Sequence, residues 1–100
     1  MDWLERLAEV RIRRWQQRVE AGEQVPPPPP LVFESWESQL VREIVSLRRE
    51  ARSAAEPAPL LRRADDLELQ LVVAVERDRP RLAQELRRVI ARGVAADAPP

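Results

Sequence analysis

The side chains of this 100-residue chain that could do chemistry are carboxylates, arginines and four serines, because histidine, lysine, cysteine, tyrosine, threonine and asparagine are all absent. Without histidine or lysine, the serines have no residue of the usual kind to activate them as nucleophiles. The commonest nitrogen and sulfur ligands of metal ions are missing as well. We therefore predict no catalytic residue, no metal site and no cofactor, and we expect a protein that is not an enzyme.

The densest acidic cluster consists of Asp65, Asp66 and Glu68. Carboxylate oxygens at this spacing could hold a hard cation such as Mg²⁺. However, Arg62 and Arg63 each lie three residues before one of the aspartates, and such neighbours pair on a helix surface. The simpler interpretation is a set of local ion pairs.

The overall charge balance does not indicate a polyanionic partner, since 17 basic residues, all arginine, face 17 acidic ones. The absence of cysteine fits a reducing compartment. Residues 1–30 lack the apolar core of a signal peptide, and no run of about 18 apolar residues could span a bilayer. We expect a cytoplasmic protein without membrane contact.

The apolar residues recur every three or four positions, which predicts an all-α fold. The expected architecture is a small helical bundle of about four helices with a polyproline linker after the first. The helices are expected at about 3–21, 35–55, 60–77 and 80–93. The corresponding organisation is an N-terminal amphipathic helix (1–22), a polyproline connector (23–34), an antiparallel three-helix region (35–93) and a frayed tail (94–100).

Capping residues define the predicted helix ends. Asp2 and Glu5 have the spacing of an N-terminal capping box, and Gly22 stands where a C-terminal cap is expected. Glu34 or Ser35 is expected to open the second helix, with Ser35 favoured as its cap, and Gly93 is expected to end the last one. The segment LQLVVAV (69–75) is apolar nearly all round, which predicts burial on more than one side.

Five consecutive prolines, 26–30, exclude helix and sheet between the first two helices. They favour a polyproline II rod, which is both a chemically suitable ligand for proline-reading domains and a stiff spacer. We favour the connector, because the rod directly joins two helices.

Aromatic residues at helix ends and a leucine-rich seam in the second helix indicate protein contacts. The apolar residues exceed what a three-helix core needs, so we expect a protein partner, with a homodimer as the simplest form. The candidate partner-binding residues are Trp3, Trp15, Phe33, Trp36, Leu40, Ile44 and Leu47.

Arginine-rich helix faces provide an alternative, binding to RNA or a ribonucleoprotein. The candidate nucleic-acid residues are Arg11, Arg14, Arg18, Arg81 and Arg88. Acidic residues such as Glu5, Glu9 and Glu20 interleave with the first three, and phosphate affinity depends on positive charge. A solvated, ion-paired face is the competing interpretation.

The order of motifs resembles the conserved domain of the DnaJ-homologue subfamily C member 28 family, which also occurs as a stand-alone bacterial protein. The matching motifs are the L-x-E-x-R-I-R pattern of the first helix, the Gly-Glu step after it, the Pro-Leu end of the loop, Trp36 and the following EIVSLRRE helix, and Arg79-Pro80 before the last helix. The residues of the first three are Leu7, Glu9, Arg11, Ile12, Arg13, Gly22, Glu23, Pro30 and Leu31.

The resemblance implies a chaperone-associated role, with two departures. Prolines replace the family's glycine-rich loop, and Gln24 stands where the family has Phe. A chain without histidine also cannot contain the His-Pro-Asp tripeptide of a J domain.

The sequence therefore predicts a small, non-enzymatic helical module for protein interaction, with a chaperone-associated accessory role as one form of it. RNA binding is the alternative. An antitoxin-like or regulatory partner of another small protein also fits the size and charge of the chain.

Overall fold

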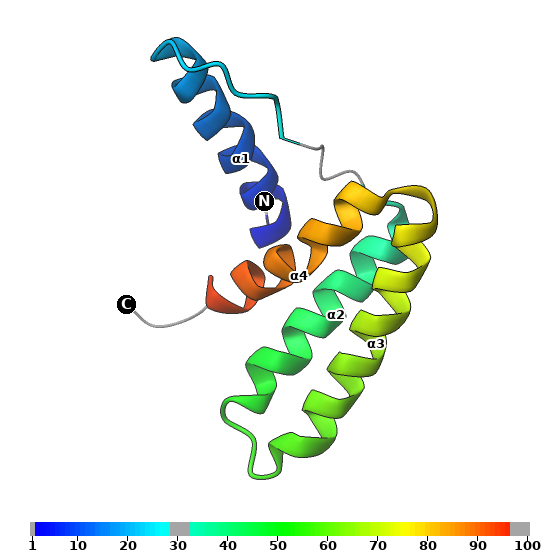
Figure 1. Cartoon of the computed structure of the whole chain (residues 1–100). Helices are drawn as coiled ribbons and strands as arrows, with labels where there is room; N and C mark the ends of the chain where they lie inside the picture. Colours follow the sequence, from blue (N-terminus) through cyan, green and yellow to red (C-terminus); the bar gives the residue numbers. More distant parts are fainter. Residues whose placement is uncertain (1, 29–32, 97–100) are drawn as a thin grey trace. The chain divides into compact units, whose positions relative to one another are not determined.

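A computed structural model describes residues 2–28 and 33–96, and these residues form four α-helices and no strand (Figure 1). The predicted all-α class is confirmed. The helices are α1 (Trp3–Glu20), α2 (Ser35–Ala51), α3 (Pro57–Asp78) and α4 (Pro80–Ala95). The chain divides into two compact units, Met1–Leu31 and Val32–Pro100.

The first unit is α1 with the segment that follows it. At its start the Asp2 carboxylate accepts a hydrogen bond from the Glu5 N–H at 3.1 Å. At its end Gly22 has φ +91°, where a side chain would be strained. The Gly22 N–H bonds to the Val19 carbonyl and the Glu23 N–H to the Arg18 carbonyl, each at 3.0 Å. This pair of bonds is a Schellman motif, and it confirms Gly22 as the predicted cap.

The segment after Gly22 is neither helix nor strand as far as Pro28 and runs back beside α1 (Figure 1). The Trp15 indole N–H donates to the Val25 carbonyl at 2.9 Å. An ion pair between Arg18 and Glu23, at 3.2 Å, adds a second link. Both contacts join the helix to the residues just before the proline run, whose last two residues, 29 and 30, lie outside the described residues.

The second unit is a helical hairpin, α2 and α3 side by side and antiparallel, with α4 packed against both (Figure 1). Each helix contributes aliphatic side chains at three- and four-residue spacing to one core. Burying such a side chain contributes about 1.5–3 kcal/mol, so the core is the main source of stability. Its fully buried members are Val41, Ile44, Val45, Ala64, Leu71, Val75, Leu86, Val89 and Ile90.

One buried ion pair joins the start of α2 to the junction of α3 and α4. Glu37 is 0 % exposed, and its carboxylate accepts a hydrogen bond from Arg79, the residue between the two later helices. The same carboxylate accepts from the Glu34 N–H at 2.8 Å and so caps α2. Glu34, not Ser35, is thus the residue that precedes the helix, which corrects the sequence prediction.

Two arginines at the C-terminal end of α2 cap the C-terminus of α4. Arg49 donates to the Gly93 carbonyl, and Arg52 donates to the Val94 carbonyl at 2.8 Å. The last carbonyls of a helix have no partner within it and carry the negative end of its dipole. The guanidinium groups of Arg49 and Arg52 give these carbonyls hydrogen-bond donors and also place positive charge at the negative end of the dipole.

Three predicted boundaries were wrong. α2 ends at Ala51 rather than near 55, and residues 52–56 form the turn to α3, in which Glu56, restricted by the following proline, has φ −124° and ψ 86°. α3 begins at Pro57 rather than Leu60, because the first turn of a helix needs no amide donors and accepts proline. Gly93 lies buried inside α4, which continues to Ala95; residues 97–100 of the predicted tail lie outside the described part.

Within the described residues, no helix combines the length and apolarity needed to cross a bilayer.

Replacing Arg79 with alanine should lower the free energy of unfolding by about 3–5 kcal/mol, because the Glu37 carboxylate would stay buried without its cation. Urea unfolding followed by circular dichroism measures this change. The matched control is Arg63→Ala, which removes an exposed pair with Glu43 and should change stability by less than about 1 kcal/mol. Equal effects of the two substitutions would contradict the role of the buried pair.

Replacing Gly22 with alanine should destabilise the end of α1 by more than about 1 kcal/mol, since φ is positive there. The ¹³Cα chemical shifts of residues 18–20 should move toward random-coil values. Gln24→Ala, an exposed neighbour outside the helix, is the control and should leave these shifts in place. Helical shifts that persist in the Gly22→Ala protein would show that the Schellman motif does not set this end.

Candidate interaction surfaces

The predicted partner-binding residues do not form one surface. Trp3 and Trp15 belong to the first unit and are half-buried there. In the second unit Ile44 is fully buried, so it is a core residue and not a contact residue as predicted. Among the remaining predicted contacts Phe33, Leu40 and Leu47 are half-buried and Trp36 is 45 % exposed.

The Trp36 ring is anchored at the start of α2. Its indole N–H donates to the Glu34 carboxylate at 2.7 Å, beside the Glu37 cap. This bond fixes the ring while leaving nearly half of the residue open to solvent. Of the predicted anchors in the second unit, Trp36 is the most accessible.

Two members of the acidic cluster of α3, Asp65 and Glu68, pair with α2 and not with neighbours on their own helix as predicted. Arg48 contacts Asp65 at 3.0 Å and Glu68 at 3.1 Å. Arg63 of α3 in turn contacts Glu43 of α2 at 3.2 Å. The hydrogen bonds that Arg48 donates to the Glu68 carboxylate are the largest influence on the arginine and, with the one to Asp65, raise the pKa of its guanidinium above the ordinary value despite partial burial. The carboxylates of Asp65 and Glu68 therefore hold the two helices of the hairpin together.

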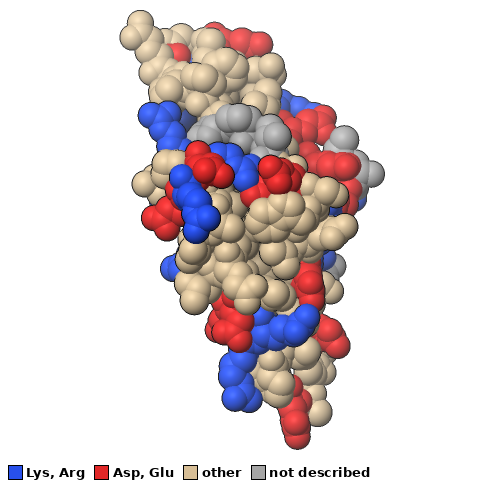
Figure 2. All heavy atoms as spheres, turned by 90° about the vertical axis from the view of Figure 1, so that its right-hand side faces the viewer, with Lys and Arg blue, Asp and Glu red and all other residues tan. Residues whose placement is uncertain are grey.

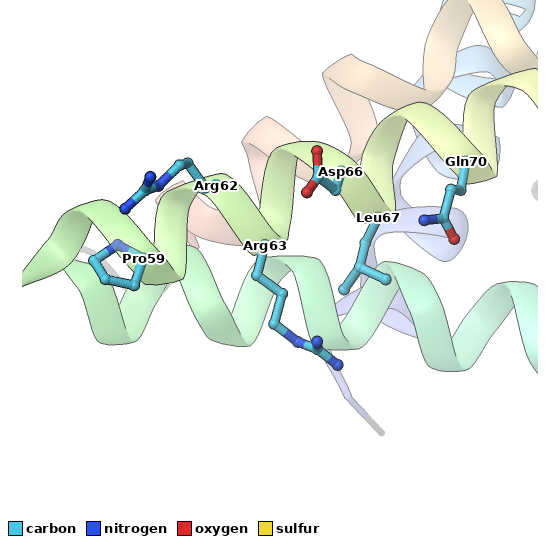
Figure 3. A pocket seen from close by; sticks show the side chains of 6 residues that line it. All are labelled: Pro59, Arg62, Arg63, Asp66, Leu67 and Gln70. Carbon is cyan, nitrogen blue, oxygen red and sulfur yellow. The ribbon is translucent and has the colours of Figure 1, made fainter.

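In the described part of the chain, no group of three or more metal-ligating side chains comes together. A shallow hollow lies beside this cluster, lined by Pro59, Arg62, Arg63, Asp66, Leu67 and Gln70, and it is wide open to solvent. Figure 3 shows Arg63 and Leu67 pointing toward α2, while Arg62 and Asp66 point away from it. Because these side chains point in opposite directions, they do not converge on a common point where a small ligand could bind.

The outer side of α3 carries an apolar patch whose residues were not among the predicted contact residues, although an apolar surplus was expected in this segment. Leu69 is 58 % and Val73 is 53 % exposed, one helical turn apart. Leu71 and Val75, two positions later in each case, are fully buried. A step of two residues turns a helix by about 200°, so the exposed pair lies opposite the core. The segment 69–75 is thus buried on one side only, which corrects the expectation of burial on several sides.

We call Leu69 and Val73, with the adjacent Gln70 and Ala74, the α3 patch. Together with Arg77 and Asp78 these residues line a second shallow, open hollow. Figure 2, which views the molecule from the side of α3, shows uncharged surface over the middle of the helix with acidic and basic side chains above and below. The apolar run of residues 69–75 was the sequence signal for this surface, but periodicity did not show which half would stay uncovered.

The predicted nucleic-acid residues divide between the units. Arg11, Arg14 and Arg18 lie on α1, where Arg18 pairs with Glu23 and Arg11 has an interaction of its own. Arg81 and Arg88 lie on α4 and are exposed.

The residues of the family resemblance have mostly local roles. Glu9 and Arg13 form an ion pair at 2.7 Å, one turn apart on α1. Gly22 and Glu23 make the Schellman motif, as described above. Leu7 is half-buried and Ile12 exposed, whereas Pro30 and Leu31 lie outside the described residues.

No protein-family model matches the chain, and neither the curated proteins nor the solved structures include a significant match to it. The resemblance to the DnaJ-homologue subfamily C member 28 family stays a prediction.

Proposed function

We propose that this protein is a small helical module that acts by binding another protein through the α3 patch. One observation carries the proposal: two large aliphatic side chains, Leu69 and Val73, stand more than half exposed on the side of α3 opposite the core. A helix that faces solvent normally presents polar residues there. An apolar patch rimmed by charges is typical of a protein-binding surface.

The surroundings of the patch support protein binding. Its rim contains both charges, with Arg77 and Asp78 at one side of the hollow. An apolar centre excludes water, and a charged rim selects the partner and its orientation. The scaffold beneath is rigid, because Leu71 and Val75 of the same turns are locked into the core.

The composition supports a binding role over a catalytic one. The chain contains no histidine, lysine or cysteine to serve as base or nucleophile. The arginine and acidic side chains of the α2–α3 contact neutralise one another, as the Arg48 pairs show. The family resemblance makes chaperone-containing assemblies the first place to look for the partner.

A second copy of the chain is the simplest occupant of the α3 patch, since two identical patches can meet about a two-fold axis. Light scattering at ~100 µM should then give a mass above the 11.5 kDa of one chain. Leu69→Glu should return the mass to that of a monomer, because the carboxylate would be desolvated at the contact. A monomer mass for the unmodified protein at this concentration would remove self-association.

The double substitution Leu69→Glu/Val73→Glu should abolish capture of protein partners by the immobilised protein. Both side chains are exposed, so the fold should tolerate the change, which circular dichroism checks. The control is Ala58→Glu, which adds one such negative charge at another exposed position of α3. Capture is measured by mass spectrometry after nuclease treatment.

Partners retained by the Ala58→Glu protein and lost by the double variant would identify the α3 patch as the binding surface. Partners bound equally by both proteins would show that another surface binds them.

A further inference from the structure

The solvent side of α4 is rich in arginine. Its exposed arginines occupy an arc of about 140° when residues are placed every 100° around the helix. The other exposed positions on this arc, Pro80, Gln84, Ala91 and Ala95, are uncharged and mostly small. We call the four exposed arginines the α4 arginine face: Arg81, Arg87, Arg88 and Arg92.

Among the described residues, none of these four guanidinium groups has an ion pair or hydrogen bond. The one carboxylate of α4, Glu85, is half-buried and is engaged in an interaction. Four arginines against one glutamate give α4 a net charge of +3 within a chain whose total is zero. The other arginines near this helix behave differently, since Arg49 and Arg52 bond to its carbonyls.

The chemistry of this face suits phosphate groups. Arginine presents a planar fork that bonds phosphate oxygens in pairs. Protein–protein interfaces, by contrast, have an apolar or aromatic centre. None of the exposed residues on the arc is a large apolar side chain, so the face lacks the centre that a protein partner would need.

The same composition favours a double strand over a single strand. Binding of single strands relies on aromatic side chains that stack on bases. The chain has four aromatic residues, and none lies in α4. The backbone of a duplex needs only charge and close approach, which the small residues between the arginines allow.

We propose that the α4 arginine face binds the phosphate backbone of double-stranded nucleic acid without regard to base sequence. From Arg81 to Arg92 the helix extends about 16 Å at 1.5 Å per residue. A duplex offers roughly one phosphate charge per 1.7 Å of its axis, so three or four arginines can each reach a phosphate. The face lies on a different helix from the α3 patch.

The test is fluorescence anisotropy of labelled 20-bp RNA and DNA duplexes titrated with the full chain. At 50 mM salt we expect a dissociation constant of about 10⁻⁵ M, as for other non-specific contacts. Raising salt to 200 mM should weaken binding about 50- to 150-fold, since three or four counterions are released. Comparison of the two duplexes shows whether RNA or DNA is preferred, and binding to either supports the proposal.

Arg88→Gln/Arg92→Gln should weaken binding at least tenfold and reduce the salt slope by about two. The matched control is Arg62→Gln/Arg77→Gln, which removes two exposed arginines from α3. Circular dichroism should show that both variants are folded.

Three results would overturn the proposal. The first is an absence of duplex binding at 50 mM salt with ~100 µM protein. The second is an equal loss of affinity in the α4 and α3 variants. The third is displacement of the duplex by poly-glutamate at equal charge, which would show a surface that accepts any polyanion.

Discussion

The contact between Glu37 and Arg79 is the constraint on which the second unit depends. It connects the first turn of α2 to the junction between α3 and α4, so one pair positions three helices. Glu37 is fully buried, and removing a carboxylate from water is expensive unless a cation and hydrogen bonds compensate it. The Glu34 N–H and Arg79 supply that compensation together.

The arginines of the second unit fall into two groups, although the net charge of the chain is zero: some bond to other helices, and others are exposed to solvent. Arg48, Arg49 and Arg52 reach from α2 to the neighbouring helices and satisfy carboxylates or helix-end carbonyls. In these positions the forked guanidinium bridges groups that a single point charge could not serve equally well. The four exposed arginines of α4 make no such contacts among the described residues. This is the physical reason for proposing that they bind phosphate groups of another molecule.

The apolar residues of α3 also fall into two groups, one buried in the core and one exposed to solvent. A three-helix core of this size uses one side of each helix, and Leu71 and Val75 fill that role on α3. Leu69 and Val73 are therefore surplus to the core, and their exposure costs solubility unless something covers them. The two proposed activities thus rest on side chains that the fold itself does not need. These are the exposed apolar side chains of α3 and the exposed arginines of α4.

The sequence by itself determined the number of helices and most of their ends, because caps and prolines act locally. Asp2, Gly22 and Pro80 each set a boundary through their own backbone chemistry, and the absence of histidine and lysine limited the available chemistry. Only the tertiary structure decided which charges meet: Asp65 pairs with Arg48, seventeen residues away, rather than with a neighbour on its own helix. It also decided which half of residues 69–75 faces solvent. Periodicity shows that a helix has an apolar side, but burial depends on which other helix covers that side, and this is a property of packing.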